Sequence, residues 1–390
     1  MNPVPAGTHS QLRLGDLARP RAQDARVAGD PRARGPGRAA ISGWPYPRAM
    51  RLLVTGATGF VGQTIVDAAI EAGHTVRGMA RDAEKAARTF ADRPIDVVLG
   101  DVGSRRDLLI ALEGMEVVVN AAATYSYRRD AAETMLRDNP AIVEAILSAA
   151  RDAGTPHVVD VSSAVVFRPH PDGPHAGIVG INSPRWDASW PHWRDPYLQS
   201  KVLAEDVVDR HRAKGAPVTS IHPAQIIGPR DRGPGQTGAV IRALLSDPSV
   251  YVDASGGWVD VRDVADAVVR LAARSPGGRV IASATYARYR TIATELDRLT
   301  GRATRRVWLP PRLLTTGADL NDRLGGRLIP ALPMRASLEW PLSATPVDGS
   351  SGERLLGRAY RPLEVSLGDT LRWWAANDIV PRSWIGRLAA

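Results

Sequence analysis

The chain has 390 residues, of which 44% are apolar and 23% charged, a composition typical of folded globular proteins. Cysteine is absent, which excludes disulfides, thiolate catalysis and zinc–thiolate sites, and we expect no metal site. Residues 1–49 hold eight Arg and three Asp, so they supply +5 of the net charge of +9. Because the remaining +4 is not gathered in a basic run with interleaved aromatic residues, we expect no nucleic-acid partner.

Residues 1–49 are rich in Pro, Gly, Ala and Arg and have no apolar periodicity, which predicts a disordered extension. They contain no apolar core of a signal peptide, and no later run approaches the ~18 residues of a membrane span. We therefore expect a cytoplasmic protein without a membrane partner. Met50 stands directly before the first strand-like run, and our hypothesis is that it is the natural start.

From residue 51 strand-like and helical patterns alternate. Such alternation predicts an α/β fold with a doubly wound parallel sheet, the Rossmann type, and right-handed crossovers. Runs that are apolar throughout, such as 117–120, fit a sheet covered on both faces. The predicted strands are 51–54, 75–79, 96–99, 117–120, 157–161, 218–222 and 279–282, and the predicted helices are 61–72, 105–112, 141–153, 198–214 and 259–273.

The pattern loosens after about residue 228, where Gly/Pro-rich stretches begin. We expect a dinucleotide-binding domain made of residues 50–228 and about 258–283. The remaining segments, about 229–257 and 284–390, are expected to form a smaller, discontinuous substrate-binding domain over the carboxyl edge of the sheet.

Three glycines, Gly56, Gly59 and Gly62, lie between the first predicted strand and the first predicted helix. Gly56 would permit a tight turn, Gly59 would let a pyrophosphate approach the backbone, and Gly62 would let the helix pack close to the strand. Such a turn aims backbone N–H groups and a positive helix end at a phosphate. We therefore predict a dinucleotide site here, with contacts that include Thr58, Phe60 and Val61.

Tyr197 and Lys201 are four residues apart, which places both on one face of a helix. A nearby ammonium stabilises a phenolate and so adapts a tyrosine to acid–base chemistry. With 8 Tyr and only three Lys in the chain, chance predicts well under one such pair. A third member should come from a strand end, and we choose Ser163, with Ser162 in reserve; capping of the strand end is the alternative reading for either serine.

The motifs follow one another in a characteristic order. The glycine turn is followed by Asn120-Ala-Ala-Ala, Val161-Ser-Ser-Ala, the Tyr197/Lys201 pair and Pro223-x-x-Ile-Ile-Gly-Pro. This order resembles the extended short-chain dehydrogenase/reductase superfamily, which includes NAD(P)-dependent epimerases, dehydratases and dihydroflavonol-reductase-like enzymes. The resemblance implies a nicotinamide cofactor and also suggests a homodimer.

The resemblance also implies residue roles. Tyr197 would be the general acid/base, Lys201 would bind the nicotinamide ribose and tune Tyr197, and Ser163 would hold the substrate oxygen. Further cofactor contacts that it implies are Asp101 and Val102, Ala121, Ala122 and Ala123, and Pro223.

The end of the second predicted strand bears on the choice of cofactor. A carboxylate there would hold a ribose 2′-OH, whereas an arginine suits a 2′-phosphate. Ala80 occupies the place of the acidic residue and Arg81 follows it, although Asp82 comes next. We predict NADP(H), with NAD as the alternative.

Aromatic residues precede and follow the catalytic motifs: Tyr125, Tyr127, Trp186, Trp190 and Trp193. Their flat apolar surface suits a planar or alicyclic ketone, with Gln225 as a further substrate contact, unless the tryptophans simply pack a loop. We therefore predict an NADP(H)-dependent ketone/aldehyde reductase or alcohol dehydrogenase. The alternatives are an NAD-dependent sugar-nucleotide epimerase/dehydratase and a non-catalytic cofactor-sensing regulator.

Overall fold

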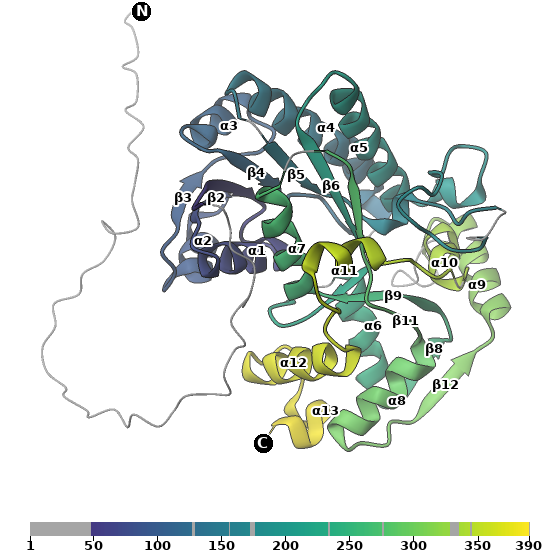
Figure 1. Ribbon diagram of the computed structural model, residues 1–390. Coiled ribbons are helices and arrows are strands. Elements are labelled where there is room, and N and C mark those ends of the chain that lie inside the picture. The colour runs from purple at the N-terminus through teal and green to yellow at the C-terminus, as the bar shows by residue number, and fades with distance from the viewer. Residues whose placement is uncertain are drawn as a thin grey trace, which may run out of the picture.

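The computed structural model describes residues 48–126, 129–155, 157–171, 176–232, 235–274, 277–327, 335–343 and 345–389 (Figure 1). All but the last two residues of the predicted N-terminal extension lie outside these ranges, and so does Tyr127. Among the described residues, no helix combines the length and the apolar character needed to cross a membrane.

A seven-stranded parallel sheet forms the centre of the molecule, in the spatial order β10-β6-β5-β4-β1-β2-β3. The chain enters in the middle at β1, builds one side with β2 and β3, then crosses over to build the other side from β4. This order confirms the predicted doubly wound α/β fold, and its switch point lies between β1 and β4. The strands are β1 (Arg51–Thr55), β2 (Thr75–Ala80), β3 (Asp96–Leu99), β4 (Val117–Asn120), β5 (His157–Val161), β6 (Val218–Pro223) and β10 (Arg279–Ala282).

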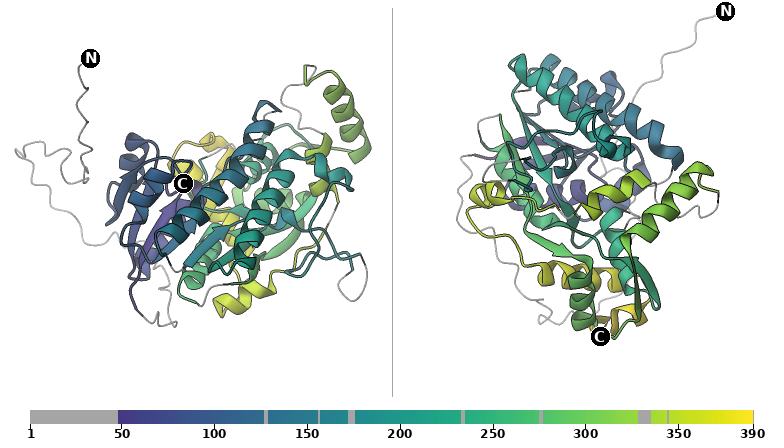
Figure 2. Two further views of the ribbon diagram at one scale, coloured as in Figure 1. Left: turned by 90° about the horizontal axis from the view of Figure 1, so that it is seen from above. Right: turned by 90° about the vertical axis from the view of Figure 1, so that its right-hand side faces the viewer.

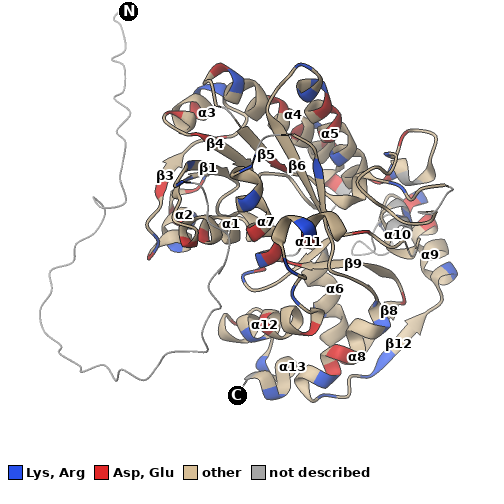
Figure 3. Ribbon diagram, viewed as in Figure 1, with Lys and Arg blue, Asp and Glu red and all other residues tan. Residues whose placement is uncertain are grey.

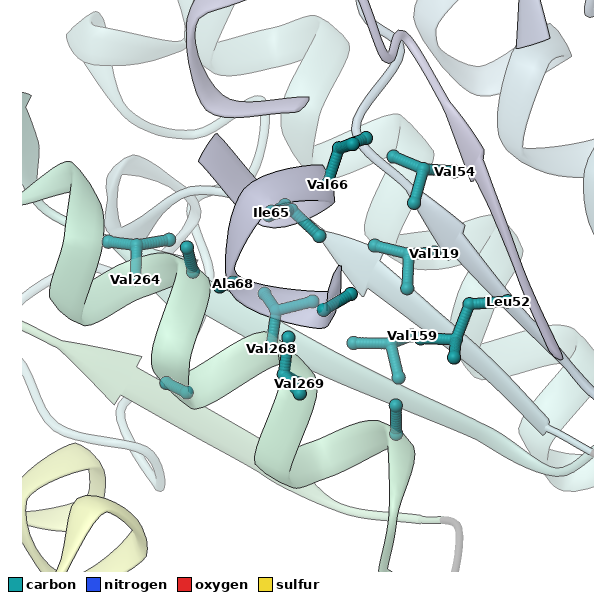
Figure 4. Close-up of a cluster of buried hydrophobic side chains, with 14 of the residues drawn as sticks. Leu52, Val54, Ile65, Val66, Ala68, Val119, Val159, Val264, Val268 and Val269 are labelled. Atoms are coloured by element: carbon teal, nitrogen blue, oxygen red, sulfur yellow. The ribbon is translucent and has the colours of Figure 1, made fainter. Parts of the chain in front are cut away.

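Helices cover both faces of this sheet, as Figure 2 shows. Successive strand residues point to opposite faces. Leu52 of β1 therefore packs towards Ile65 and Val268, which come from α1 (Phe60–Glu71) and α7 (Val261–Ala272) (Figure 4).

Leu53, the next residue of β1, packs in the cluster on the other face. That cluster includes side chains from α3 (Arg105–Leu112), α4 (Ala132–Asp152) and α5 (Pro196–Ala213). Because both faces are buried, the central strands are apolar throughout. Acidic and basic residues are mixed on the outer helices α3, α4 and α5 (Figure 3).

Three elements differ from the sequence-based expectation. Helix α4 begins at Ala132 rather than at residue 141, and Pro140 lies inside it although it lacks the N–H that a helix interior uses. Helix α2 (Ala83–Phe90) was not predicted; it begins where the carboxylate of Asp82 accepts the N–H of Lys85. Helix α7 begins two residues later than predicted because Ser255–Asp260 form the strand β9.

The remaining elements contain a third cluster of buried side chains, which includes Trp258, Ile292 and Trp374. Two small sheets contribute to this region, in the orders β11-β9-β7 and β12-β8. The elements are β7 (Gln225–Ile227), β8 (Ser249–Val252), β9, β11 (Thr285–Arg288), β12 (Arg306–Leu309), α6 (Gln236–Leu245), α8 (Tyr289–Thr300), α9 (Pro311–Arg323), α10 (Arg335–Leu342), α11 (Ser350–Leu356), α12 (Leu363–Ala376) and α13 (Arg382–Ile385).

Candidate active site

A cavity of about 670 Å³ lies at the carboxyl ends of the central strands. The turn after β1, the segments after β4 and β5, and the first turn of α5 all contribute to its wall. In doubly wound folds this edge of the sheet, beside the switch point, is where ligands bind. The predicted site residues that line it are Thr58, Gly59, Phe60, Val61, Gly62, Ala121, Ala123, Tyr125, Ser163, Tyr197, Pro223 and Gln225.

The glycine turn has no room for side chains at two of its three glycines. Gly56 has φ +63°, and a Cβ there would lie 2.6 Å from the carbonyl oxygen of Ala121. A Cβ on Gly62 would collide with the carbonyl oxygen of Gly56. Gly59 instead lines the cavity, directly before α1. The turn thus brings a helix N-terminus and bare backbone to the cavity wall, as an anionic ligand requires.

Tyr197 lies in the first turn of α5, and its position is set by the start of that helix. The carboxylate of Asp195 accepts the N–H groups of Tyr197 and Leu198, at 2.8 and 3.3 Å, and Pro196 takes the first helical position. The ring of Tyr125 meets the Tyr197 ring edge-on, with centroids 4.6 Å apart. Tyr197 is therefore held at the cavity wall by a helix cap and an aromatic contact.

Lys201 follows one helical turn later on the same face of α5. Its side chain is only 8% exposed and does not form part of the cavity wall. The lysine thus lies behind the tyrosine, in surroundings from which water is almost excluded.

Both candidate serines line the cavity at the end of β5. The hydroxyl oxygen of Ser163 accepts the N–H of Val165 at 3.3 Å and caps a short 3-10 helix, Ala164–Val166. The capping role considered from the sequence is therefore present. Accepting this hydrogen bond leaves the hydroxyl proton of Ser163 available for donation to a ligand, because a hydroxyl donates one hydrogen bond while accepting others.

Asn139 of α4 joins the segment after β4 to α5. Its amide is buried, accepts the N–H of Thr124 at 2.8 Å, and donates to the carbonyl oxygen of Thr124 and to the Ser200 hydroxyl. The segment leading to Tyr125 is thereby tied to α5 beside Lys201.

The residues predicted to select the cofactor lie at the edge of the cavity. Arg81 is exposed after β2 and is not part of the wall, whereas Lys85 of α2 is. The carboxylate of Asp82 accepts the N–H of Lys85 at 2.9 Å, so it serves as a helix cap. Lys85 was missed from the sequence, although being one of three lysines marked it as unusual.

Asp101 and Val102 lie in the turn after β3. The Asp101 carboxylate accepts the N–H of Gly103 at 2.7 Å, and neither residue is part of the cavity wall. Ala122 also lies outside the wall, next to two alanines that belong to it.

The three tryptophans predicted to contact substrate do not line the cavity. Trp186 is buried and meets the ring of Trp190 edge-on at 5.7 Å, and the guanidinium of Arg168 lies over Trp190. Trp193 packs against the same apolar cluster as Trp186. The alternative interpretation, packing of a loop, describes these side chains, because burying large rings against each other stabilises a loop without a ligand.

Part of the cavity wall comes from residues that sequence reasoning missed. Arg230, Asp231 and Arg232 line it after β7, and Ser337 and Val347 line it from the C-terminal region. Arg230 pairs with Asp67 of α1, which connects the segment after β7 to the helix that follows the glycine turn. The charged triplet was a visible signal in the sequence, but nothing marked Ser337 or Val347.

Comparison with known proteins agrees with this geometry. The chain is 29% identical to "Sterol demethylase protein B" of Methylococcus capsulatus over 85% of its own length and all of that protein. It is 28% identical to "Putative dihydroflavonol 4-reductase" of Synechocystis sp. over 84% of its own length and 95% of the relative. Among solved structures it resembles gox2253, with a TM-score of 0.73 and 26% identity, covering 85% of this chain and 99% of the other.

A model of one family matches residues 52–282, which span the whole seven-stranded sheet except the first residue of β1. The matched region contains the glycine turn, both serines and the Tyr197/Lys201 pair. The chain therefore belongs to the NAD-dependent epimerase/dehydratase family, and it is an extended short-chain dehydrogenase/reductase.

Proposed function

We propose that this protein is an NADP(H)-dependent reductase of ketones or aldehydes, able to run in reverse as an alcohol dehydrogenase. The observation that carries the proposal is that Tyr197, Ser163 and the glycine turn line the same cavity. An acid/base group, an oxyanion donor and a phosphate-binding turn are the parts that carbonyl reduction requires.

The residues around the cavity fit a dinucleotide. Space at Gly59 and the N-terminus of α1 suit a pyrophosphate, and Ala121 and Pro223 offer small apolar surfaces on the way to Tyr197. A bound nicotinamide would supply the hydride, which is chemistry that no amino-acid side chain provides.

The protein's own groups would handle the proton. Ser163 would donate its hydroxyl proton in a hydrogen bond to the carbonyl oxygen, and Tyr197 would transfer its phenolic proton to the developing alkoxide. Lys201, one turn behind, would favour the phenolate that this leaves. In the oxidative direction the same groups would act in reverse, with the Tyr197 phenolate as base.

Two cations support NADPH rather than NADH. Arg81 and Lys85 flank Asp82, whose carboxylate is engaged as the cap of α2. Position 80, where a carboxylate would hold a ribose diol, is an alanine. A 2′-phosphate carries the charge that two cations would bind, whereas a diol does not.

We further propose a substrate with a flat apolar or aromatic body. The apolar and aromatic residues of the cavity wall include Tyr125, Met135, Ile226 and Val347, and the Tyr125 ring contacts that of Tyr197. The names of two relatives, a sterol demethylase protein and a putative dihydroflavonol reductase, point to polycyclic or aromatic substrates.

Oxidation of NADPH by a panel of carbonyl compounds, followed at 340 nm, tests the proposal. We expect turnover with at least one cyclic or aromatic ketone and lower kcat/KM with NADH. Purified protein that carries tightly bound NAD and leaves NADPH unoxidised with every compound would instead support a sugar-nucleotide epimerase.

A further inference from the structure

A carboxyl group is buried inside the central sheet, below the candidate active site. Asp160 of β5 is 4% exposed and lies between Asn120 of β4 and Ser220 of β6 in the strand register. The same strand leads into Ser162 and Ser163, which line the cavity. An ionisable group in such a place is costly unless it is hydrogen-bonded and paired with an opposite charge.

A chain of hydrogen bonds holds Asp160 in place. The Thr55 hydroxyl donates to Oδ1 of Asn120 at 2.8 Å, and Nδ2 of Asn120 donates to Oδ1 of Asp160 at 2.7 Å. The N–H of Ala122 also donates to Oδ1 of Asn120, at 3.1 Å. These donors fix the orientation of the Asn120 amide, so that its NH2 group faces the carboxyl group.

Asp160 and Lys201 both face the interface between the sheet and α5. Ser220, the partner of Asp160 in the strand register, donates a hydrogen bond to Glu205 at 3.1 Å, and Glu205 is one helical turn beyond Lys201. Burial raises the pKa of Asp160, while attraction to Lys201 and the hydrogen bond from Asn120 oppose the rise. The ionised form of Asp160 therefore depends on the ammonium near it, and the nearly buried ammonium in turn needs an anion.

The other buried acid near Lys201 is already engaged. Glu205, one turn further along α5, accepts a hydrogen bond from Arg279 and pairs with His222, at 3.2 and 3.1 Å. Burial alone would raise the pKa of Glu205, but His222 and Arg279 hold it well below its usual range. Of the two acids, Asp160 is the one without an arginine or histidine bonded to it in the described part of the chain.

We propose that Asp160 is a positioning residue, a buried negative charge that orients the Lys201 ammonium behind Tyr197 by electrostatic attraction. The inference rests on the proposed function, in which Lys201 binds the cofactor ribose and assists Tyr197. Since Asp160 and Ser163 belong to one strand end, β5 would set both the lysine and the oxyanion donor. The charged or titratable groups that act on Asp160 are Lys201 and Glu205 on α5 and His222 on β6, and Tyr197 lies one turn before Lys201 on the same helix.

The test is a double-mutant cycle on the binding of NADPH and on kcat. Asp160→Asn should raise the NADPH Kd about fivefold and lower kcat about tenfold in the parent, but change either less than about twofold in a Lys201→Met background. Equal losses in both backgrounds would mean a merely structural role, and no loss in the parent would also overturn the proposal. NADPH that does not bind the parent protein would instead refute the proposed function.

The chain offers a matched control and a second variant. Asp209→Asn removes a carboxylate two turns beyond Lys201 on the same helix, where it pairs with Arg279 and Arg212, and should leave the NADPH Kd within about twofold. Thr55→Val loosens Asn120 without changing a buried charge. If Asp160→Asn fails to fold, Thr55→Val takes its place. It should lower kcat two- to threefold in the parent protein and have no effect on kcat in the Lys201→Met background. An equal loss of kcat in the Lys201→Met background would overturn the proposal.

A spectroscopic readout needs no substrate. Protein grown with [ε-13C]lysine has signals from only three lysines, and the Lys201 signal is the one missing from Lys201→Met. Asp160→Asn should move this signal while those of Lys85 and Lys214 stay in place, and Asp209→Asn should move it less. An unmoved Lys201 signal in folded Asp160→Asn would overturn the assignment.

Discussion

The cavity wall is built in two different ways. The first part of the wall comes from segments that directly follow strands of the main sheet, and includes residues 58–63, Ala121, Ala123 and residues 162–165. The second part of the wall comes from single residues or short segments elsewhere in the chain, among them 230–232, Ser337 and Val347.

This difference suggests that the two parts of the wall have different roles. Turns at the ends of parallel strands are held by the sheet, so they present the same groups to every ligand. Segments from outside the sheet can vary without disturbing it. We therefore expect changes in the first part of the wall to affect cofactor binding and chemistry, and changes in the second part to affect the choice of substrate.

The largest effect should come from Tyr197→Phe. Loss of the phenolic proton should lower kcat by about 10³-fold, within the range of general acid/base catalysis, while NADPH binding changes little. Single-turnover rates and NADPH fluorescence titration measure the two quantities. A variant with near-normal kcat would remove Tyr197 from the chemistry.

Gly62→Ala should be the next most severe change. The added methyl group would collide with the carbonyl oxygen of Gly56, and overpacking of this kind costs about 1–3 kcal/mol. Thermal unfolding and NADPH titration should both show a loss. Gly317→Ala is the control, because nothing lies near that position of α9 and alanine favours a helix; destabilisation there by the same amount would contradict the argument.

Replacing the cations at the cofactor edge should change selectivity. Arg81→Ala with Lys85→Ala should raise the KM for NADPH about tenfold or more, the loss expected when a hydrogen-bonded charge is removed, and leave the KM for NADH unchanged. Arg88→Ala, on the exposed part of α2, serves as the control. Equal rises in the KM for NADPH and in the KM for NADH would argue against a 2′-phosphate site.

The smallest effect is expected from Trp190→Ala. Its ring meets that of Trp186 edge-on and lies under the guanidinium of Arg168, and it does not line the cavity, so the KM for the carbonyl substrate should change less than about twofold. Steady-state kinetics with the best substrate of the panel decide this. A tenfold rise in this KM, with unchanged thermal stability, would instead indicate that the tryptophans contact the substrate.

Local patterns were the predictable part of the molecule. The strands of the main sheet, the glycine turn and the four-residue spacing of Tyr197 and Lys201 follow from periodicity and backbone chemistry within a few neighbouring residues. The start of α4 was misplaced because Pro140 is a local signal for a helix boundary, and packing of the helix against the sheet overrode it.

The sequence by itself therefore determined the fold class, the glycine turn between β1 and α1 and the placement of Tyr197 and Lys201 on one helix, because each depends on neighbours along the chain. Tertiary structure alone decided that Lys85 and Ser337 line the cavity, that the tryptophans do not, and that Asp160 is buried against Asn120. Those contacts join residues from distant segments, and only the packing of helices on the sheet brings such segments together.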